Sequence, residues 1–150
     1  MNSELYKYRG VLPHWRLQGS VYFVTWSLLQ GQADFAPDER TMIQSALFFF
    51  DGQRYKVNAF VVMNDHIHVL VLPFDEHPLE KIVQSWKTFT SGEMRKRSGR
   101  PLPIWKHEYM DRIVRDEAEY LKFANYILTN PVRRWPEVTD YTWVGLGADD

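Results

Sequence analysis

Two histidines separated by one residue are the clearest chemical signal in the sequence. His66 and His68 lie in the run HIHVLVL, whose β-branched and apolar residues predict a strand. Side chains two apart on a strand share a face, so both imidazoles converge while Ile67 turns into the opposite layer. Two neutral imidazoles on one face can bind a divalent metal, although most such pairs in strands bind none. The adjacent Asp65 could be a partner of a metal-bound histidine, a turn residue, or both.

A tyrosine and an asparagine form the second candidate group. Tyr126 and Asn130 are four residues apart in EAEYLKFANYILTN, which predicts a helix, so their side chains share one face. A phenol with a pKa near ~10 is a weak nucleophile at neutral pH and needs a nearby cation. Asn130 offers an amide oxygen as a third metal ligand. Taken alone, the pair is more often structural, with Tyr126 packed on the sheet and Asn130 capping the helix.

The two groups together fit one reaction. Two imidazoles and an amide would leave open positions on an octahedral cation such as Mg²⁺ or Mn²⁺. The metal would polarise a scissile phosphate while Tyr126 attacks the phosphorus in line. The leaving group is a 3′-hydroxyl and the enzyme retains a 5′-phosphotyrosine, from which a second 3′-hydroxyl can rejoin the strands. The residues therefore predict an enzyme that cuts and rejoins a phosphodiester backbone.

Composition limits the other classes of function. The 150 residues fit one domain, and 45% hydrophobic with 25% charged residues is ordinary for a globular protein. The absence of cysteine excludes disulfides, Cys-ligated zinc and thiol catalysis. The polar N-terminus lacks an apolar signal region and nothing approaches a membrane span, so we expect a cytoplasmic, nucleoid-associated protein.

The charge distribution is uneven. The net charge is −1, but residues 81–134 hold 12 Lys/Arg and 6 Asp/Glu, a net of +6, and the remaining residues carry −7. Such asymmetry is typical of one basic face that binds nucleic acid. A solvated helix that simply carries these charges explains the pattern equally well.

Hydrophobic periodicity and turn residues outline the elements. Asn64-Asp65 joins two β-rich runs as an antiparallel hairpin, and the last helix should end near Asn130 because Pro131 disfavours helical geometry in its predecessor. The fold class predicted is α+β, a ferredoxin-like antiparallel sheet flanked by helices, with an N-terminal arm at residues 1–19 and a C-terminal tail at 135–150. We expect strands at 20–28, 55–63, 66–72 and around 110–114, and helices at 37–50, 78–96 and 116–130.

Several segments carry a family resemblance. VNAFVVMNDHIHVLVLP resembles the HUH motif (His, bulky hydrophobic, His) of single-tyrosine transposases. SWKTFTSGEMRKR, IWKHEYMDRIVRDEAEY and FANYILTNPVR are similar, in the same order, to segments of the REP-associated tyrosine transposases. The resemblance spans residues 6–133, and the histidine pair combined with Tyr-x-x-x-Asn-Pro-Val-Arg makes it specific.

The resemblance implies a set of roles. In that family the HUH histidines bind the divalent metal, here His66 and His68; the helix tyrosine is the nucleophile, here Tyr126; and the polar residue one turn later completes the metal site, here Asn130. Members have an antiparallel sheet between helices and act on single-stranded DNA hairpins at repeated extragenic palindromes. By resemblance, the candidates for DNA contact are Lys87, Arg95, Lys96, Arg97, Arg112, Arg115 and Arg133.

Some features leave alternatives open. Asn64-Asp65 stands where the family usually has Pro-Asn, which keeps the metal pair but changes the charge beside it. A catalytically silent hairpin-binding module and a water-using metal-dependent hydrolase with a structural Tyr126 are the other readings. Tyr109 and Tyr141 compete for the role of nucleophile, and Trp86 and Trp105 could stack on bases. A monomer is slightly favoured over a homodimer.

Overall fold

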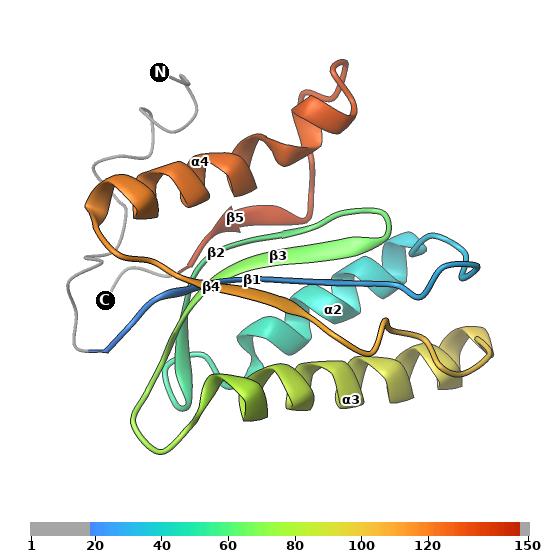
Figure 1. Cartoon of the computed structure of the whole chain (residues 1–150). Coiled ribbons are helices and arrows are strands. Elements are labelled where there is room, and N and C mark those ends of the chain that lie inside the picture. Colours follow the sequence, from blue (N-terminus) through green and yellow to red (C-terminus); the bar gives the residue numbers. More distant parts are fainter. Residues whose placement is uncertain (1–18, 148–150) are drawn as a thin grey trace.

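One antiparallel sheet carries helices on both of its faces (Figure 1). The computed structural model describes residues 19–147; the arm expected at residues 1–19 lies, but for Gly19, outside the described residues. Within that range the strand order is β4-β1-β3-β2-β5. The predicted α+β fold class is confirmed. The strands are β1 (Tyr22–Ser27), β2 (Tyr55–Val62), β3 (His66–Pro73), β4 (Met110–Ile113) and β5 (Val144–Leu146), and the helices are α2 (Pro37–Phe49), α3 (Leu79–Ser98) and α4 (Glu117–Arg134).

Strand β3 is central because it pairs with β1 on one side and with β2 on the other. The β2–β3 connection is the predicted hairpin, in which the backbone N–H of Met63 donates to the carbonyl of His66 over 2.8 Å. Residues 67–72 of β3 are all buried, as expected for a strand covered on both faces.

Side chains that alternate along the strands form two separate cores. On one face, residues such as Trp26 and Ile67 pack against α2 and α3. There Trp86 of α3 stacks on Trp26 at 5.6 Å between ring centroids and donates a hydrogen bond to the Tyr55 hydroxyl over 2.9 Å. On the other face, residues such as Leu70 pack against Ala124 and other apolar side chains of α4.

Helix α4 departs from the prediction that it ends near Asn130. It continues through Pro131 to Arg134, with Pro131 buried inside the helix. Burial of the Pro131 ring stabilises the helix by more than the steric clash with the residue before proline destabilises it. The N–H of Trp135 closes the last turn by donating to the carbonyl of Pro131 over 2.7 Å. The extra turn carries Arg133 onto the same helix as Tyr126.

The segment after α4 contains a strand that the sequence analysis did not assign. Strand β5 pairs with the outer edge of β2. Three aromatic side chains lead into it: Trp135 stacks on Tyr141 at 5.6 Å, and Tyr141 meets Trp143 edge to face at 5.5 Å. Their packing explains the aromatic content of residues 135–147. Among the described residues, no helix is long and apolar enough to cross a membrane.

Creating a cavity in the core between α2 and the sheet should lower the stability of the protein. Leu47 of α2 is fully buried. Leu47→Ala should lower the free energy of unfolding by about 2–5 kcal/mol, because it removes buried methyl groups and leaves a void. Urea denaturation measures this. Phe49→Ala, two residues later and 71% exposed, is the control and should change the value by less than about 0.5 kcal/mol. Equal effects of the two changes would contradict the assigned face of α2.

Candidate active site on the α4 face of the sheet

His66 and His68 stand at the start of β3 with both rings on the face that α4 covers. Their ring centroids are 4.7 Å apart. Ile67 between them is fully buried in the opposite core with α2 and α3. The strand period thus brings the two imidazoles together at the end of the sheet where the hairpin turns.

Each imidazole uses its Nδ1 atom for a hydrogen bond within the protein. Nδ1 of His66 lies 2.7 Å from a carboxylate oxygen of Asp65, and because a carboxylate only accepts, this nitrogen carries the proton. Nδ1 of His68 lies 2.6 Å from the hydroxyl of Thr25, its direct partner across β1 and β3. Nε2 of His68 is buried and has no hydrogen-bond partner in the described part of the chain. With Nδ1 held, Nε2 of each ring is the atom left to bind a ligand.

Burial keeps His68 uncharged. Its side chain is 6% exposed, and removal from water, aided by repulsion from His66, lowers its pKa from 6.5 to about 3. A metal ligand must be a neutral imidazole, so His68 is in the form that binds a cation across the physiological range. Thr25 was not found from the sequence, because only strand pairing sets it opposite His68.

Tyr126 of α4 lies against the histidines. Its ring meets that of His68 edge to face at 5.2 Å between centroids, and the side chain is 38% exposed. Phe23 of β1 forms a shared wall, stacked on His68 at 5.4 Å and edge-on to Tyr126 at 6.0 Å. The phenol therefore sits beside the imidazoles and still reaches solvent.

The other tyrosines are placed differently. Tyr120, on the same helix, is 2% exposed and its hydroxyl has no partner among the described residues, so burial raises the pKa of its phenol. Tyr141 donates its hydroxyl proton to the carbonyl of Val62 in the β2 strand. Tyr109 packs against the core on the α2 and α3 side. Only Tyr126 of these four contacts a histidine ring of the pair.

An arginine lies over the Tyr126 ring. The guanidinium carbon of Arg133 is 4.7 Å from the ring centroid. Its Nε and Nη2 donate to the hydroxyl of Thr129 over 3.1 and 2.6 Å, and that hydroxyl donates to the carbonyl of Asn125 over 2.8 Å. Thr129 thus fixes a positive charge beside the phenol, which sequence reasoning missed because a buried threonine in a helix usually has only a packing role.

The donor set fits a hard divalent metal that also keeps water ligands. Residues 19–147 contain no group of three or more His, Cys, Asp or Glu side chains that could hold a metal. A metal here would therefore rely on the two free Nε2 atoms with an amide oxygen and water. Asn130, one helical turn after Tyr126 on α4, is 8% exposed.

Comparison with known proteins gives the family. The family "Transposase IS200 like" matches residues 37–130, more than half of the chain. The chain belongs to the IS200-like transposase family. The predicted family resemblance is thereby confirmed at this level. No curated protein matches the sequence.

Two solved structures are similar to this transposase. One is a REP-associated tyrosine transposase bound to a REP hairpin, with a TM-score of 0.71 and 20% identity over 85% of this chain and 77% of that one. The other is a protein from Deinococcus radiodurans R1 that has been assigned as a transposase, with a TM-score of 0.52 and 17% identity over 75% of this chain and 92% of that one. At these identities they show a shared fold.

The predicted DNA-contact residues of this transposase divide between two faces. The guanidinium of Arg133 lies over the Tyr126 ring. Arg112 of the edge strand β4 lies 5.6 Å from the centroid of the Phe123 ring of α4 and forms an ion pair with Glu119 over 3.1 Å. Arg115 is exposed in the loop before α4. Arg133 and Arg112 therefore lie on the side of the sheet that carries the histidines, and Arg115 directly precedes the helix that covers this side.

The remaining basic residues belong to α3, below the opposite face. The ammonium of Lys87 donates to the carbonyls of Lys106 and His107 over 2.9 and 3.0 Å, so it holds that loop. Lys96 and Arg97 pair with Glu93, and Arg95 is exposed. Trp86 and Trp105 are both buried and offer no surface for a base.

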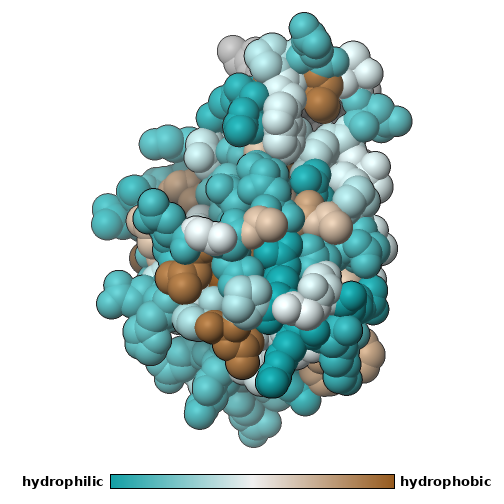
Figure 2. Space-filling view, turned by 90° about the vertical axis from the view of Figure 1, so that its right-hand side faces the viewer, coloured by the Kyte–Doolittle hydropathy of each residue, from teal (hydrophilic) through white to brown (hydrophobic). Residues whose placement is uncertain are grey.

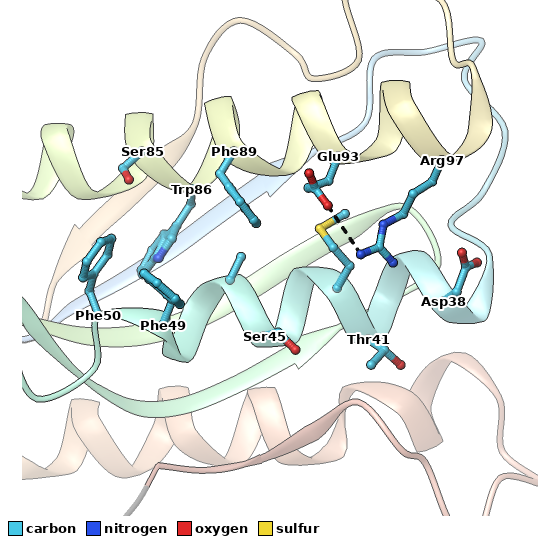
Figure 3. Close-up of a pocket in the computed structure, with 12 residues that line it drawn as sticks. Asp38, Thr41, Ser45, Phe49, Phe50, Ser85, Trp86, Phe89, Glu93 and Arg97 are labelled. Carbon is cyan, nitrogen blue, oxygen red and sulfur yellow. Dashed lines mark hydrogen bonds and ion pairs between the residues drawn. The ribbon is translucent and has the colours of Figure 1, made fainter.

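The surface at the site differs from the surface on the opposite face of the sheet. The end of the molecule that carries the β2–β3 turn shows mainly hydrophilic side chains with isolated hydrophobic ones (Figure 2). Between α2 and α3 lies a groove of about 620 Å³ with Phe49, Trp86 and Phe89 toward one end and Asp38 and Arg97 toward the other (Figure 3). This groove is on the face opposite the histidines, and of the candidate site residues it includes only Arg97.

The buried His68 predicts a pH dependence of stability. Because its pKa is lower in the folded chain than in the unfolded one, the unfolded state binds an extra proton between pH 6.5 and 3. The contribution of His68 to the free energy of unfolding is therefore present above pH 6.5 and is lost as the pH drops. Between pH 7 and pH 5 the free energy of unfolding of the metal-free wild type should fall by about 2 kcal/mol more than that of His68→Gln. Urea denaturation at the two pH values measures this difference. Equal losses in the two proteins would show that His68 is protonated in the fold.

Proposed function

We propose that this transposase cleaves and rejoins single-stranded DNA at a hairpin, with Tyr126 as the nucleophile and a divalent metal held by His66, His68 and Asn130. The observation that carries the proposal is the 5.2 Å approach of the Tyr126 ring to His68, whose Nε2 has no partner in the described chain. A purely structural tyrosine would not need to be 38% exposed with its ring against a buried imidazole that keeps an unpaired nitrogen.

In the proposed reaction, the Tyr126 oxygen forms a bond to a backbone phosphorus and the bond from that phosphorus to the 3′-oxygen breaks. The phenolic proton leaves to solvent and the departing 3′-oxygen takes one up. Arg133, fixed by Thr129, stabilises the negative charge on the phosphate. Mg²⁺ or Mn²⁺, when bound, supplies Lewis-acid polarisation of the phosphate oxygen. The reverse step, attack by a second 3′-hydroxyl, rejoins the strand and frees Tyr126.

Hairpin DNA is the proposed substrate because a structure with the same fold is bound to a REP hairpin. Arg112, Arg115 and Arg133 would contact phosphates of the strand near Tyr126. Duplex or flanking DNA would contact the basic residues of α3, which are Lys87, Arg95, Lys96 and Arg97. Lys87 also donates a hydrogen bond to the loop at Lys106. The Tyr126 ring already lies against His68 of its own chain, so we also propose an active monomer formed by a single domain. We also propose that the protein works in the cytoplasm on the nucleoid.

Replacement of the nucleophile is the direct test. Tyr126→Phe should abolish the denaturant-resistant protein–DNA adduct, because the ring remains but the attacking oxygen is gone. The assay uses labelled hairpin DNA from the gene's own flanks with Mn²⁺ and a denaturing gel. Tyr120→Phe, on the same helix, is the matched control and should leave the adduct intact, since that hydroxyl is buried. If Tyr126→Phe still cuts the DNA, the protein is a water-using hydrolase. If the wild type binds the hairpin without cutting it, the protein is a binding module.

The proposed metal site makes a second prediction. EDTA present from the start of the reaction should prevent formation of the adduct, and an excess of Mg²⁺ or Mn²⁺ should restore its formation. Thr25→Val and Asp65→Asn should each weaken Mn²⁺ binding by about 10–100-fold in calorimetry, because each removes the group that orients one imidazole. Asp38→Asn, an exposed carboxylate on α2, should leave the affinity unchanged. An unchanged affinity in the double variant His66→Ala/His68→Ala would place the metal elsewhere.

A further inference from the structure

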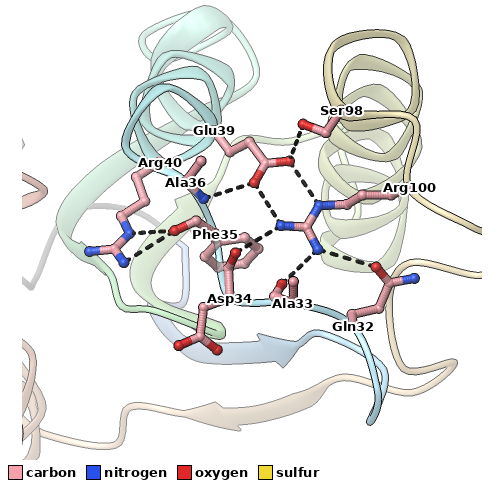
Figure 4. Close-up of polar contacts among 9 residues, drawn as sticks. All are labelled: Gln32, Ala33, Asp34, Phe35, Ala36, Glu39, Arg40, Ser98 and Arg100. Carbon is pink, nitrogen blue, oxygen red and sulfur yellow. Dashed lines mark hydrogen bonds and ion pairs between the residues drawn. The ribbon is translucent and has the colours of Figure 1, made fainter.

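A buried ion pair on the far side of the sheet joins α2 to the end of α3. The side chains of Glu39 and Arg100 are 1% and 8% exposed. Arg100 donates from Nε and Nη2 to both carboxylate oxygens of Glu39, over 2.8 and 2.7 Å (Figure 4). Ser98 and the backbone N–H of Ala36 each donate to the same carboxylate over 2.8 Å. The pair is held in one geometry by four hydrogen bonds.

The carboxylate is fully ionised despite its burial. Burial alone raises the pKa of Glu39, but the hydrogen bonds from Arg100, Ala36 and Ser98 and the charge of Arg100 outweigh it and bring the pKa to about 2. An ionised Glu39 in turn fixes the plane of the Arg100 guanidinium, whose remaining N–H groups point away from it.

Those N–H groups hold the loop between β1 and α2. Arg100 donates to the carbonyls of Ala33 and Asp34 over 2.6 and 3.0 Å and to the side-chain oxygen of Gln32 over 3.2 Å (Figure 4). Loop carbonyls have no strand partner, so the buried guanidinium helps to fix the course of residues 32–34, while Arg40 donates to the Phe35 carbonyl over 3.3 and 3.2 Å (Figure 4).

The same loop supports the turn that precedes His66. The N–H of Phe35 donates to the carbonyl of Asn64 over 2.8 Å, and the side-chain amide of Asn64 donates to the carboxylate of Asp34 over 3.1 Å. The N–H of Leu28 donates to the carbonyl of Asp65 over 2.9 Å. The backbone of Asn64 and Asp65 is therefore set by the loop and not by the hairpin alone.

We propose that Arg100, oriented by Glu39, is a positioning residue for the metal ligand His66. It fixes residues 33 and 34, which fix the Asn64-Asp65 turn, and the Asp65 carboxylate then orients the His66 ring from 2.7 Å. Asp34 is the link whose backbone contacts Arg100 and whose side chain contacts Asn64. The proposal rests on the proposed function for the role of His66 as a ligand, but the orientation of that ring can be measured without metal.

The double variant Glu39→Leu/Arg100→Met removes the positioning contacts and leaves no unpaired buried charge. Replacing a buried ion pair by apolar residues of similar volume is often neutral or stabilising, and the variant is used once circular dichroism shows that it is folded. Asp34→Ala is the second variant; it removes the hydrogen bond from Asn64 but keeps the backbone carbonyl to which Arg100 donates, and residue 34 is exposed.

The test reads the His66 tautomer by two-bond ¹H–¹⁵N correlation spectra at alkaline pH without metal. Wild type should show His66 protonated at Nδ1. In both variants the signal should shift toward a mixture with the Nε2-protonated form, while His68, held by Thr25, stays unchanged. Mn²⁺ affinity should fall about tenfold. Leu47→Ala, destabilised in the same core, and Asp38→Ala, an exposed acid near Asp34, should leave the His66 tautomer as in wild type.

The outcomes separate the two proposals. A wild-type His66 tautomer in both folded variants would overturn the positioning role of Arg100. A His66 shift in the Leu47→Ala protein as well would overturn it too, because general destabilisation would then explain the effect. If wild type binds no Mn²⁺ at the histidines, the proposed function fails, and the tautomer measurement still decides what Arg100 does.

Discussion

Strand β3 is hydrogen-bonded to β1 on one side and β2 on the other, and its side chains alternate between two cores. That constraint directs Ile67 toward α2 and α3 and leaves His66 and His68 on the α4 face. A one-residue slip in register would exchange the faces and bury both imidazoles in the wrong layer. The apolar residues that follow along β3 oppose such a slip, because each would then leave its own core.

The chemistry of the site follows from how little water reaches it. His68 is buried against Phe23 and Tyr126, so it stays neutral and keeps a nitrogen free. Tyr126 lies at the boundary, with its ring against the imidazole and the residue 38% exposed to solvent. A substrate phosphate can approach from outside while the groups that would act on it are already fixed, which lowers the cost of reorganisation.

The candidate site of this transposase is positioned by the helix layers on both faces of the sheet. Helix α4 brings Tyr126 and, through the turn after Pro131, Arg133. The opposite layer contributes no side chain to the proposed reaction, but its loop makes hydrogen bonds to the hairpin turn. Precision at a site on one face of a thin sheet thus depends on polar contacts that lie beyond the other face.

Much of this was determined by the sequence alone, where the interactions are local. The two-residue period of HIHVLVL put the histidines on one face, the helical spacing put Tyr126 near Asn130, and the motif order indicated the family. Only the tertiary structure decided that α4 crosses β3 at His68, that Thr25 lies opposite it from 43 residues away, and that Arg100 reaches the loop at Asp34. It also decided that α4 passes through Pro131 and that β5 joins the sheet. The physical reason is that strand neighbours and buried ion pairs are chosen by the packing free energy summed over the whole chain, which no short segment contains.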